Sequence, residues 1–243
     1  MTDQPPVERR HYGDHASQFF DLYAPSLPAE QHRGTVVSIH GGYWREKYGL
    51  DINAPMADHF ANQGFWVANI EYRRIAPDTT EGVWPEMSSD ILAVIDATTT
   101  HDGPTYLLGH SAGGQLALWA AAQPEVDVRG VIALAPVTDL FLADGLELSK
   151  HATRELFGAT AAEKPDLYAT ASPLHLLPFD VPQLILHGQA DEDVPVEMTV
   201  DYAETAQFLG NDMTFVSEPG VDHFDIIDPT HSIWRSITGW LNK

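Results

Sequence analysis

Short apolar runs alternate with helical segments along this chain of 243 residues. The runs are rich in β-branched residues and are bounded by turn-forming residues, which is typical of strands buried on both faces of a parallel sheet. This pattern predicts strands at 35–39, 65–70, 105–108, 130–134, 183–186 and 213–216. The partly alternating stretch 17–23 predicts an antiparallel strand at an edge of the sheet.

Helical segments are predicted between the strands, at about 54–63, 87–100, 112–123, 197–210 and 230–242. The segment 112–123 is apolar nearly all round, so we expect it to be buried against the sheet. Alternating strands and helices predict the α/β class: a mostly parallel twisted sheet of about eight strands with helices on both faces. The length of the chain fits a single domain, residues 1–243.

One connection is too long to be an ordinary link between a strand and a helix. It spans residues from about 137 to 178 and contains a weak helical pattern around 150–157. Long insertions of this kind often cover a binding site. We therefore predict a small cap-like insertion there.

The charge of the chain narrows the range of partners. Thirty-five Asp and Glu against 13 Lys and Arg give a net charge of −22, which repels nucleic-acid phosphates and anionic lipid surfaces. We therefore expect the protein to bind a small-molecule partner and neither nucleic acid nor a membrane. The sequence leaves open whether the protein forms a homodimer. No long apolar span or leader pattern is seen, so a cytoplasmic location is expected. The absence of cysteine excludes disulfides, thiolate metal sites and a cysteine nucleophile.

The motif Gly109-His110-Ser111-Ala112-Gly113 carries the strongest chemical signal. It has the form G-x-S-x-G, and it lies where a predicted buried strand meets a predicted buried helix. Glycines on both sides leave room for the sharp turn that exposes a nucleophilic serine. The alternative is a glycine-rich connection with an incidental serine. The context favours Ser111 as the nucleophile.

A serine needs a base, and the base needs a carboxylate that fixes its orientation. The loop after strand 183–186 is rich in acids, and it lies at the carboxyl edge of the sheet, where α/β proteins place their sites. We predict Asp191 as the acid, ahead of Asp193 and of Asp139, which follows strand 130–134. A solvated surface role is the alternative for all three.

The predicted base is His223, which follows strand 213–216 and reaches the same edge of the sheet. Three other histidines are alternatives for the base. His110 precedes the nucleophile on its strand and is expected to point to the opposite face as a packing residue. His187 is expected to be a structural loop residue, and His231 lies too far past the end of the strand.

Backbone N–H groups must stabilise the negative charge that develops on a substrate oxygen. The segment His40-Gly41-Gly42-Tyr43-Trp44 follows strand 35–39, where esterases carry a glycine-rich oxyanion loop. We assign the oxyanion hole to the amides of Gly42, Tyr43 and Ala112. Trp44 is a candidate substrate contact, although large apolar residues near a sheet are more often core.

These motifs together resemble an α/β-hydrolase of the kynurenine formamidase (arylformamidase) and carboxylesterase group. The resemblance extends from about residue 12 to the end, and the sequence HGG-Tyr43-Trp44 favours the formamidase branch, with Tyr43 in place of the usual third glycine. The order Ser111, Asp191, His223 matches that of the group. The resemblance implies hydrolysis of N-formyl-L-kynurenine, a step of tryptophan catabolism, with no metal and no cofactor. The alternatives are a carboxylesterase of broad specificity on short acyl esters and a non-catalytic binding module on the same fold.

Overall fold

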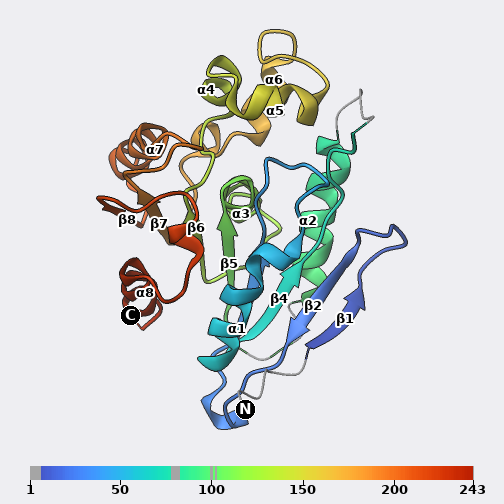
Figure 1. Cartoon of the computed structure of the whole chain (residues 1–243), viewed down its shortest axis with the longest axis vertical. Coiled ribbons are helices and arrows are strands. Elements are labelled where there is room, and N and C mark those ends of the chain that lie inside the picture. The colour runs from blue at the N-terminus through green and yellow to red at the C-terminus, as the bar shows by residue number, and fades with distance from the viewer. Residues whose placement is uncertain (1–6, 78–82, 99–100, 102, 243) are drawn as a thin grey trace.

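A computed structural model of the chain describes residues 7–77, 83–98, 101 and 103–242. In this part of the chain, eight strands form one sheet in the order β1-β2-β4-β3-β5-β6-β7-β8 (Figure 1). The strands are β1 (Val7–His11), β2 (Phe19–Tyr23), β3 (Thr35–Ile39), β4 (Trp66–Ile70), β5 (Thr105–His110), β6 (Gly130–Leu134), β7 (Gln183–Gly188) and β8 (Met213–Glu218). From β4 to β8 neighbouring strands are parallel, while β1 and β2 are antiparallel.

Helices cover both faces of the sheet, as predicted. One hydrophobic cluster joins the sheet to α2 (Trp84–Thr98), α3 (Ala112–Ala121) and α7 (Val196–Phe208). A second cluster joins the other face to α1 (Ala54–Asn62) and α8 (Arg235–Leu241). These two clusters, together with the parallel strand pairing, confirm the predicted α/β architecture.

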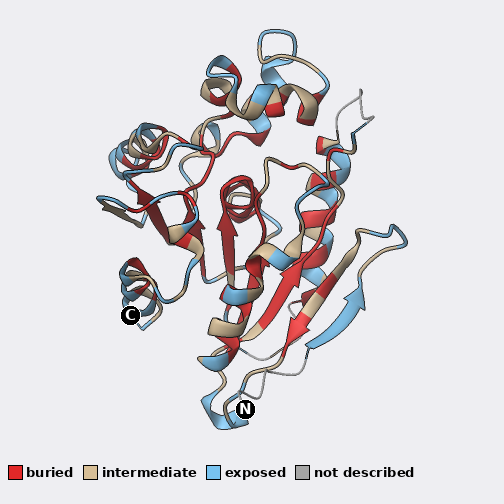
Figure 2. Cartoon of the chain, viewed as in Figure 1, coloured by how far each residue is buried: buried red, intermediate tan, exposed pale blue. Residues whose placement is uncertain are grey.

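The centre of the sheet is the most deeply buried part of the molecule (Figure 2). Every residue of β3, β6 and β7 is buried, as is every residue of α3, which explains why these segments are apolar nearly throughout. The carboxyl ends of β3, β5 and β7 therefore form a rigid base, while β8, at the edge of the sheet, is half-buried. Loops that leave such a base can hold side chains in fixed positions.

The segment predicted as a cap contains three short helices, which Figure 1 shows together at one end of the molecule. They are α4 (Leu140–Gly145), α5 (Leu148–Phe157) and α6 (Pro165–Ala171). The weak pattern at 150–157 corresponds to α5, and the pattern did not predict α4 or α6. That the segment 137–178 covers a binding site stays a prediction.

Strand β1 was also missed by the sequence pattern. Its residues VERRH are polar except for Val7 and are all exposed, so no buried face produces an alternating signal. Strand β1 forms by antiparallel pairing with β2, and the ion pair between Arg9 and Asp21, at 2.7 Å, supports this pairing. The predicted helix 87–100 begins earlier, at Trp84, and residues 99 and 100 lie outside the described part of the chain. No helix among the described residues has the length and apolar character needed to span a membrane.

Candidate active site

Ser111 lies at a sharp turn between β5 and α3. Its φ of 55° and ψ of −121° are strained for a residue with a side chain, as expected for a nucleophile that must stand clear of the backbone. A Cβ atom at Gly109 would overlap the carbonyl of Gly113, and one at Gly113 would overlap the carbonyl of Ile39. The two glycines of the motif are therefore required by the close packing of this turn.

Asp191 and His223 come together from the loops after β7 and β8. The Oδ2 atom of Asp191 lies 2.6 Å from Nδ1 of His223, and both side chains are almost inaccessible to solvent. Ser111 and His223 line the same cavity, which has a volume of about 100 Å³. The structure thus places Ser111 and His223 at one cavity, and Asp191 contacts Nδ1 of the His223 imidazole without lining the cavity itself.

Hydrogen bonds fix the Asp191 carboxylate from three sides. Oδ1 accepts the backbone N–H groups of Asp193 at 2.9 Å and Val194 at 2.8 Å. Oδ2 lies 3.1 Å from Nε2 of His187 in addition to its contact with His223. Burial opposes ionisation of this carboxyl, but the hydrogen bonds from His187 and His223 outweigh it and hold its pKa well below the ordinary value. Asp191 is therefore a carboxylate at neutral pH, as an orienting acid must be.

His187 contributes more than the sequence interpretation assigned to it. It is a residue of β7 rather than of a loop, and its Nε2–H faces two acceptors, Asp191 and the carbonyl of Val194. Its Nδ1 then accepts the hydroxyl of Thr199 at 2.7 Å. The four-residue spacing from His187 to Asp191 was the available signal for this support.

The alternative residues have other contacts. The carboxylate of Asp139 caps α4 by accepting the N–H groups of Phe141 and Leu142. The side chain of Asp193 is exposed at the cavity, where its backbone carbonyl accepts the hydroxyl of Tyr43 at 2.6 Å. His231 caps the short 3-10 helix Ser232–Trp234.

The predicted oxyanion loop follows β3 and faces Ser111 across the cavity. Gly42, Tyr43 and Trp44 all have positive φ, at 108°, 49° and 60°. The N–H groups of Gly42 and Tyr43 donate to no backbone or side-chain acceptor in the described part of the chain. Ala112 opens α3, where the first N–H groups have no partner within the helix. These amides can therefore receive an anionic oxygen.

A buried polar network that the sequence did not reveal holds this loop. His40 Nε2 lies 2.9 Å from the Glu71 carboxylate, and its ring stacks on Tyr72 with centroids 4.6 Å apart. The Tyr72 hydroxyl donates to the carbonyl of His40 at 2.8 Å. Because Glu71 is far from His40 in the sequence, no local pattern predicts this contact.

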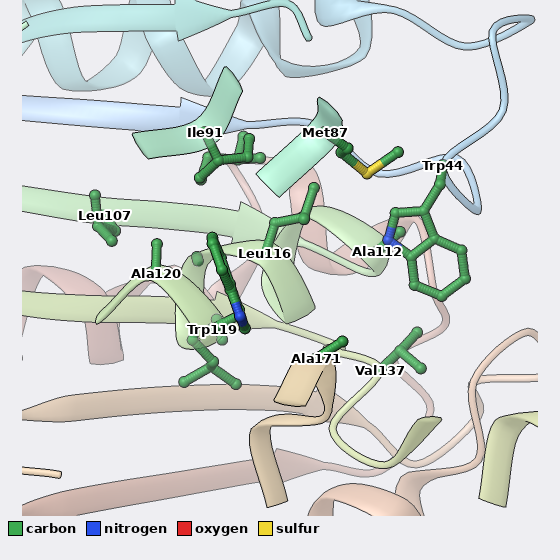
Figure 3. Packing of buried hydrophobic residues seen from close by; sticks show 14 of the residues in the cluster. Trp44, Met87, Ile91, Leu107, Ala112, Leu116, Trp119, Ala120, Val137 and Ala171 are labelled. Atoms are coloured by element: carbon green, nitrogen blue, oxygen red, sulfur yellow. The ribbon is translucent and has the colours of Figure 1, made fainter. Parts of the chain in front are cut away.

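The structure does not place Trp44 at the cavity. Its indole is 1% exposed and packs in the core beside Ala112 and Val137 (Figure 3). Its Nε1–H donates to Gln115 at 3.0 Å. The expectation of a substrate contact is therefore wrong: the Trp44 side chain lies in the core, and Tyr43 lines the cavity instead.

The expectation for His110 is confirmed in part: it is a buried packing residue, but its side chain does not point away from the site. Its ring lines the cavity and lies against the ring of His223, with centroids 4.5 Å apart. Its Nε2–H donates to the carbonyl of His223 at 2.9 Å. His110 keeps its regular pairing with Leu134 in β5, and its side chain lies on the side that the loop of His223 reaches.

Acidification should lower the free energy of unfolding partly through His110. Burial, and next the charge of His223, lowers the pKa of His110 well below its ordinary value. The unfolded chain then binds a proton that the folded chain does not, so stability decreases as pH falls below about 6.5, by up to about 1.4 kcal/mol per pH unit. Urea unfolding between about pH 7.5 and 5.5 measures the slope, which should be shallower in H110Q. Equal slopes in the two proteins would contradict this expectation.

Among the described residues, no group of three or more His, Cys, Asp or Glu could hold a metal ion. The sequence expectation of a reaction without metal or cofactor stays a prediction. The arrangement of Ser111, His223 and Asp191 offers a nucleophile, a base and an orienting acid from the chain itself.

The eight-stranded, mostly parallel sheet, with a strained serine after its central strand β5, is the architecture of the α/β-hydrolase class. A family model described as BD-FAE matches residues 20–205, which is more than half of the chain. The chain belongs to the BD-FAE family.

Individual relatives are distant. A kynurenine formamidase of Salmo salar is 23% identical over 89% of this chain and 74% of its own length. Esterase LipC of Mycobacterium tuberculosis is 24% identical over 91% of this chain and 61% of its own length. A truncated carbohydrate esterase from gut microbiota has a similar fold, with a TM-score of 0.79, 19% identity, and coverage of 100% of this chain and 97% of that chain.

Proposed function

We propose that this hydrolase cleaves a small aryl formamide of the N-formyl-L-kynurenine type, or an ester, through an acyl-enzyme on Ser111. The observation that carries the proposal is the 2.6 Å contact between Asp191 and His223 at the cavity that Ser111 lines. Such a pair lets the imidazole act as a base toward the serine hydroxyl while the carboxylate stabilises the imidazolium that forms.

The reaction has two matched halves. The Ser111 oxygen bonds to the acyl carbon as His223 takes its proton, and the carbonyl oxygen becomes an oxyanion beside the amides of Gly42, Tyr43 and Ala112. The bond to the leaving group then breaks, and His223 gives its proton to the departing amine or alcohol. Water repeats these steps, which releases the acid and restores Ser111.

The size and lining of the cavity support a small acyl group and an aromatic leaving group. A volume of about 100 Å³ holds only a few heavy atoms beside the nucleophile. Tyr48 and Phe224 line the same cavity, and Phe224 is 61% exposed, so an aromatic ring has apolar surface to contact. Similarity to a kynurenine formamidase agrees with this substrate class.

A carboxylesterase acting on short acyl esters is the second candidate, supported by the small cavity and by similarity to esterase LipC. Comparing kcat/KM for N-formyl-L-kynurenine and p-nitrophenyl acetate distinguishes the two. A formamidase should favour the formamide by at least about tenfold, since specific polar contacts discriminate on this scale. A higher kcat/KM for p-nitrophenyl acetate would assign the protein to the carboxylesterases. If neither substrate is cleaved and a fluorophosphonate does not label the serine, the proposal is refuted.

A further inference from the structure

Arg45 joins the oxyanion loop to the helical segment 137–178. It follows Trp44 directly, and its N–H donates to the carbonyl of Gly42 at 3.1 Å. Its guanidinium makes two bonds to the carboxylate of Glu155, at 2.7 and 3.0 Å. It also donates to the hydroxyl and to the carbonyl of Ser149, each at 2.7 Å. The position of Ser149 is therefore tied to the loop that binds the substrate oxygen.

The backbone around Ser149 has an unusual conformation. Glu147, Ser149, Lys150 and His151 have φ values of 55°, 47°, 58° and 65°, a left-handed conformation that residues other than glycine seldom adopt. Such a conformation is strained for a residue with a side chain, so the bonds from Arg45 to Ser149 offset a real strain. The strained turn places Ser149 in the wall of the cavity that Ser111 and His223 line.

The hydroxyl of Ser149 has an unused donor. Its oxygen accepts the charged N–H of Arg45, which leaves the O–H proton to donate elsewhere. In the described part of the chain it donates to no protein acceptor. A hydroxyl that accepts from a guanidinium is polarised and becomes a stronger donor. The acyl oxygen of a substrate is taken by the oxyanion amides, so this proton is available to a second acceptor.

We propose that Ser149, held by Arg45, is a specificity residue that donates a hydrogen bond to an acceptor on the leaving group of the substrate. The inference rests on the proposed function. A formyl or acetyl group has no second acceptor, so the acceptor belongs to the leaving group, whose ring contacts Tyr48 and Phe224. The preferred substrates are thus aryl esters or anilides with a carbonyl substituent on the ring.

Isosteric substrate pairs test the proposal. The 2-, 3- and 4-acetylphenyl acetates each have a carbonyl acceptor, and the matching isopropenylphenyl acetates have the same shape without it. The measured quantity is the ratio of kcat/KM within each pair, compared between the native protein and S149A, so that the intrinsic reactivity of each ester cancels. We expect the ratio for at least one ring position to fall by about tenfold in S149A, the effect of one polarised hydrogen bond.

Two further variants separate the hydroxyl from the strained backbone. S149G removes the hydroxyl and relieves the positive φ, so it should lose the same preference as S149A. S88A removes a half-buried serine hydroxyl that donates to the carbonyl of Pro85 and does not line the cavity, and it should keep the native ratios. Native ratios for all pairs in both Ser149 variants would overturn this inference alone. A native protein that cleaves none of the esters and is not labelled by a phosphonate would overturn the proposed function, and the inference with it.

Discussion

Replacing Ser111 by alanine should lower kcat by about five to six orders of magnitude, because the variant lacks the hydroxyl on which the proposed acyl-enzyme forms. The hydroxyl lies at the strained turn between β5 and α3, beside the cavity that His223 lines. Residual activity should come only from the oxyanion amides and from binding of the substrate. The measurement is kcat for the better of the formamide and acetate substrates, with active-site titration of the native protein as reference.

The variant must be shown to fold before the loss is interpreted. Ser111 is buried, and removing one oxygen leaves the apolar packing of α3 unchanged, so urea unfolding should give a midpoint close to that of the native protein. Fluorophosphonate labelling should disappear in the same variant. A folded S111A protein that keeps most of its turnover would refute the acyl-enzyme mechanism.

The sequence predicted the sheet because its strands are buried on both faces. Runs such as 35–39 and 130–134 are mostly apolar and are buried throughout, as is typical of the centre of a parallel sheet. The polar strand β1 has no such signal, and it forms through pairing with β2. The helices α4 and α6 are too short for a helical period to be detected.

The candidate site was predicted where local sequence determines geometry. The glycines beside Ser111 are required by the turn itself, so the motif is sufficient to predict it. The side-chain directions of Trp44 and His110 were misassigned because a strand or loop pattern does not reveal which segment packs against each side chain. Contacts such as His40 with Glu71 join distant segments and become visible only in three dimensions.

Hydrogen bonds connect all the loops around the cavity to one another. The Tyr43 hydroxyl joins the oxyanion loop to the acid loop at Asp193, and His110 joins the nucleophile strand to the loop of His223. Arg45 joins the oxyanion loop to Ser149. Because the loops that carry Gly42, Ser111 and Asp191 also start from buried strand ends, these groups are held in place before a substrate binds, which is the condition for electrostatic stabilisation of an oxyanion.

Replacing Asp191 by asparagine should lower kcat by roughly four orders of magnitude while the protein remains folded. An amide can still accept from the N–H groups of Asp193 and Val194, so the loop keeps its shape. It lacks the charge that stabilises an imidazolium at His223, and its NH₂ group can donate to Nδ1 and select the wrong tautomer. Because chemistry rather than binding is impaired, KM should change little.

Two matched variants locate this effect at Asp191. D193N alters an exposed carboxylate two residues away, and D139N alters the cap of α4, where asparagine is an equally good cap. Both should keep kcat within about threefold of the native value, since neither carboxylate contacts His223 in the structure. A large loss of kcat in D139N, with D191N remaining active, would move the orienting acid to the end of β6. That result would require the 2.6 Å contact between Asp191 and His223 to have a structural role only.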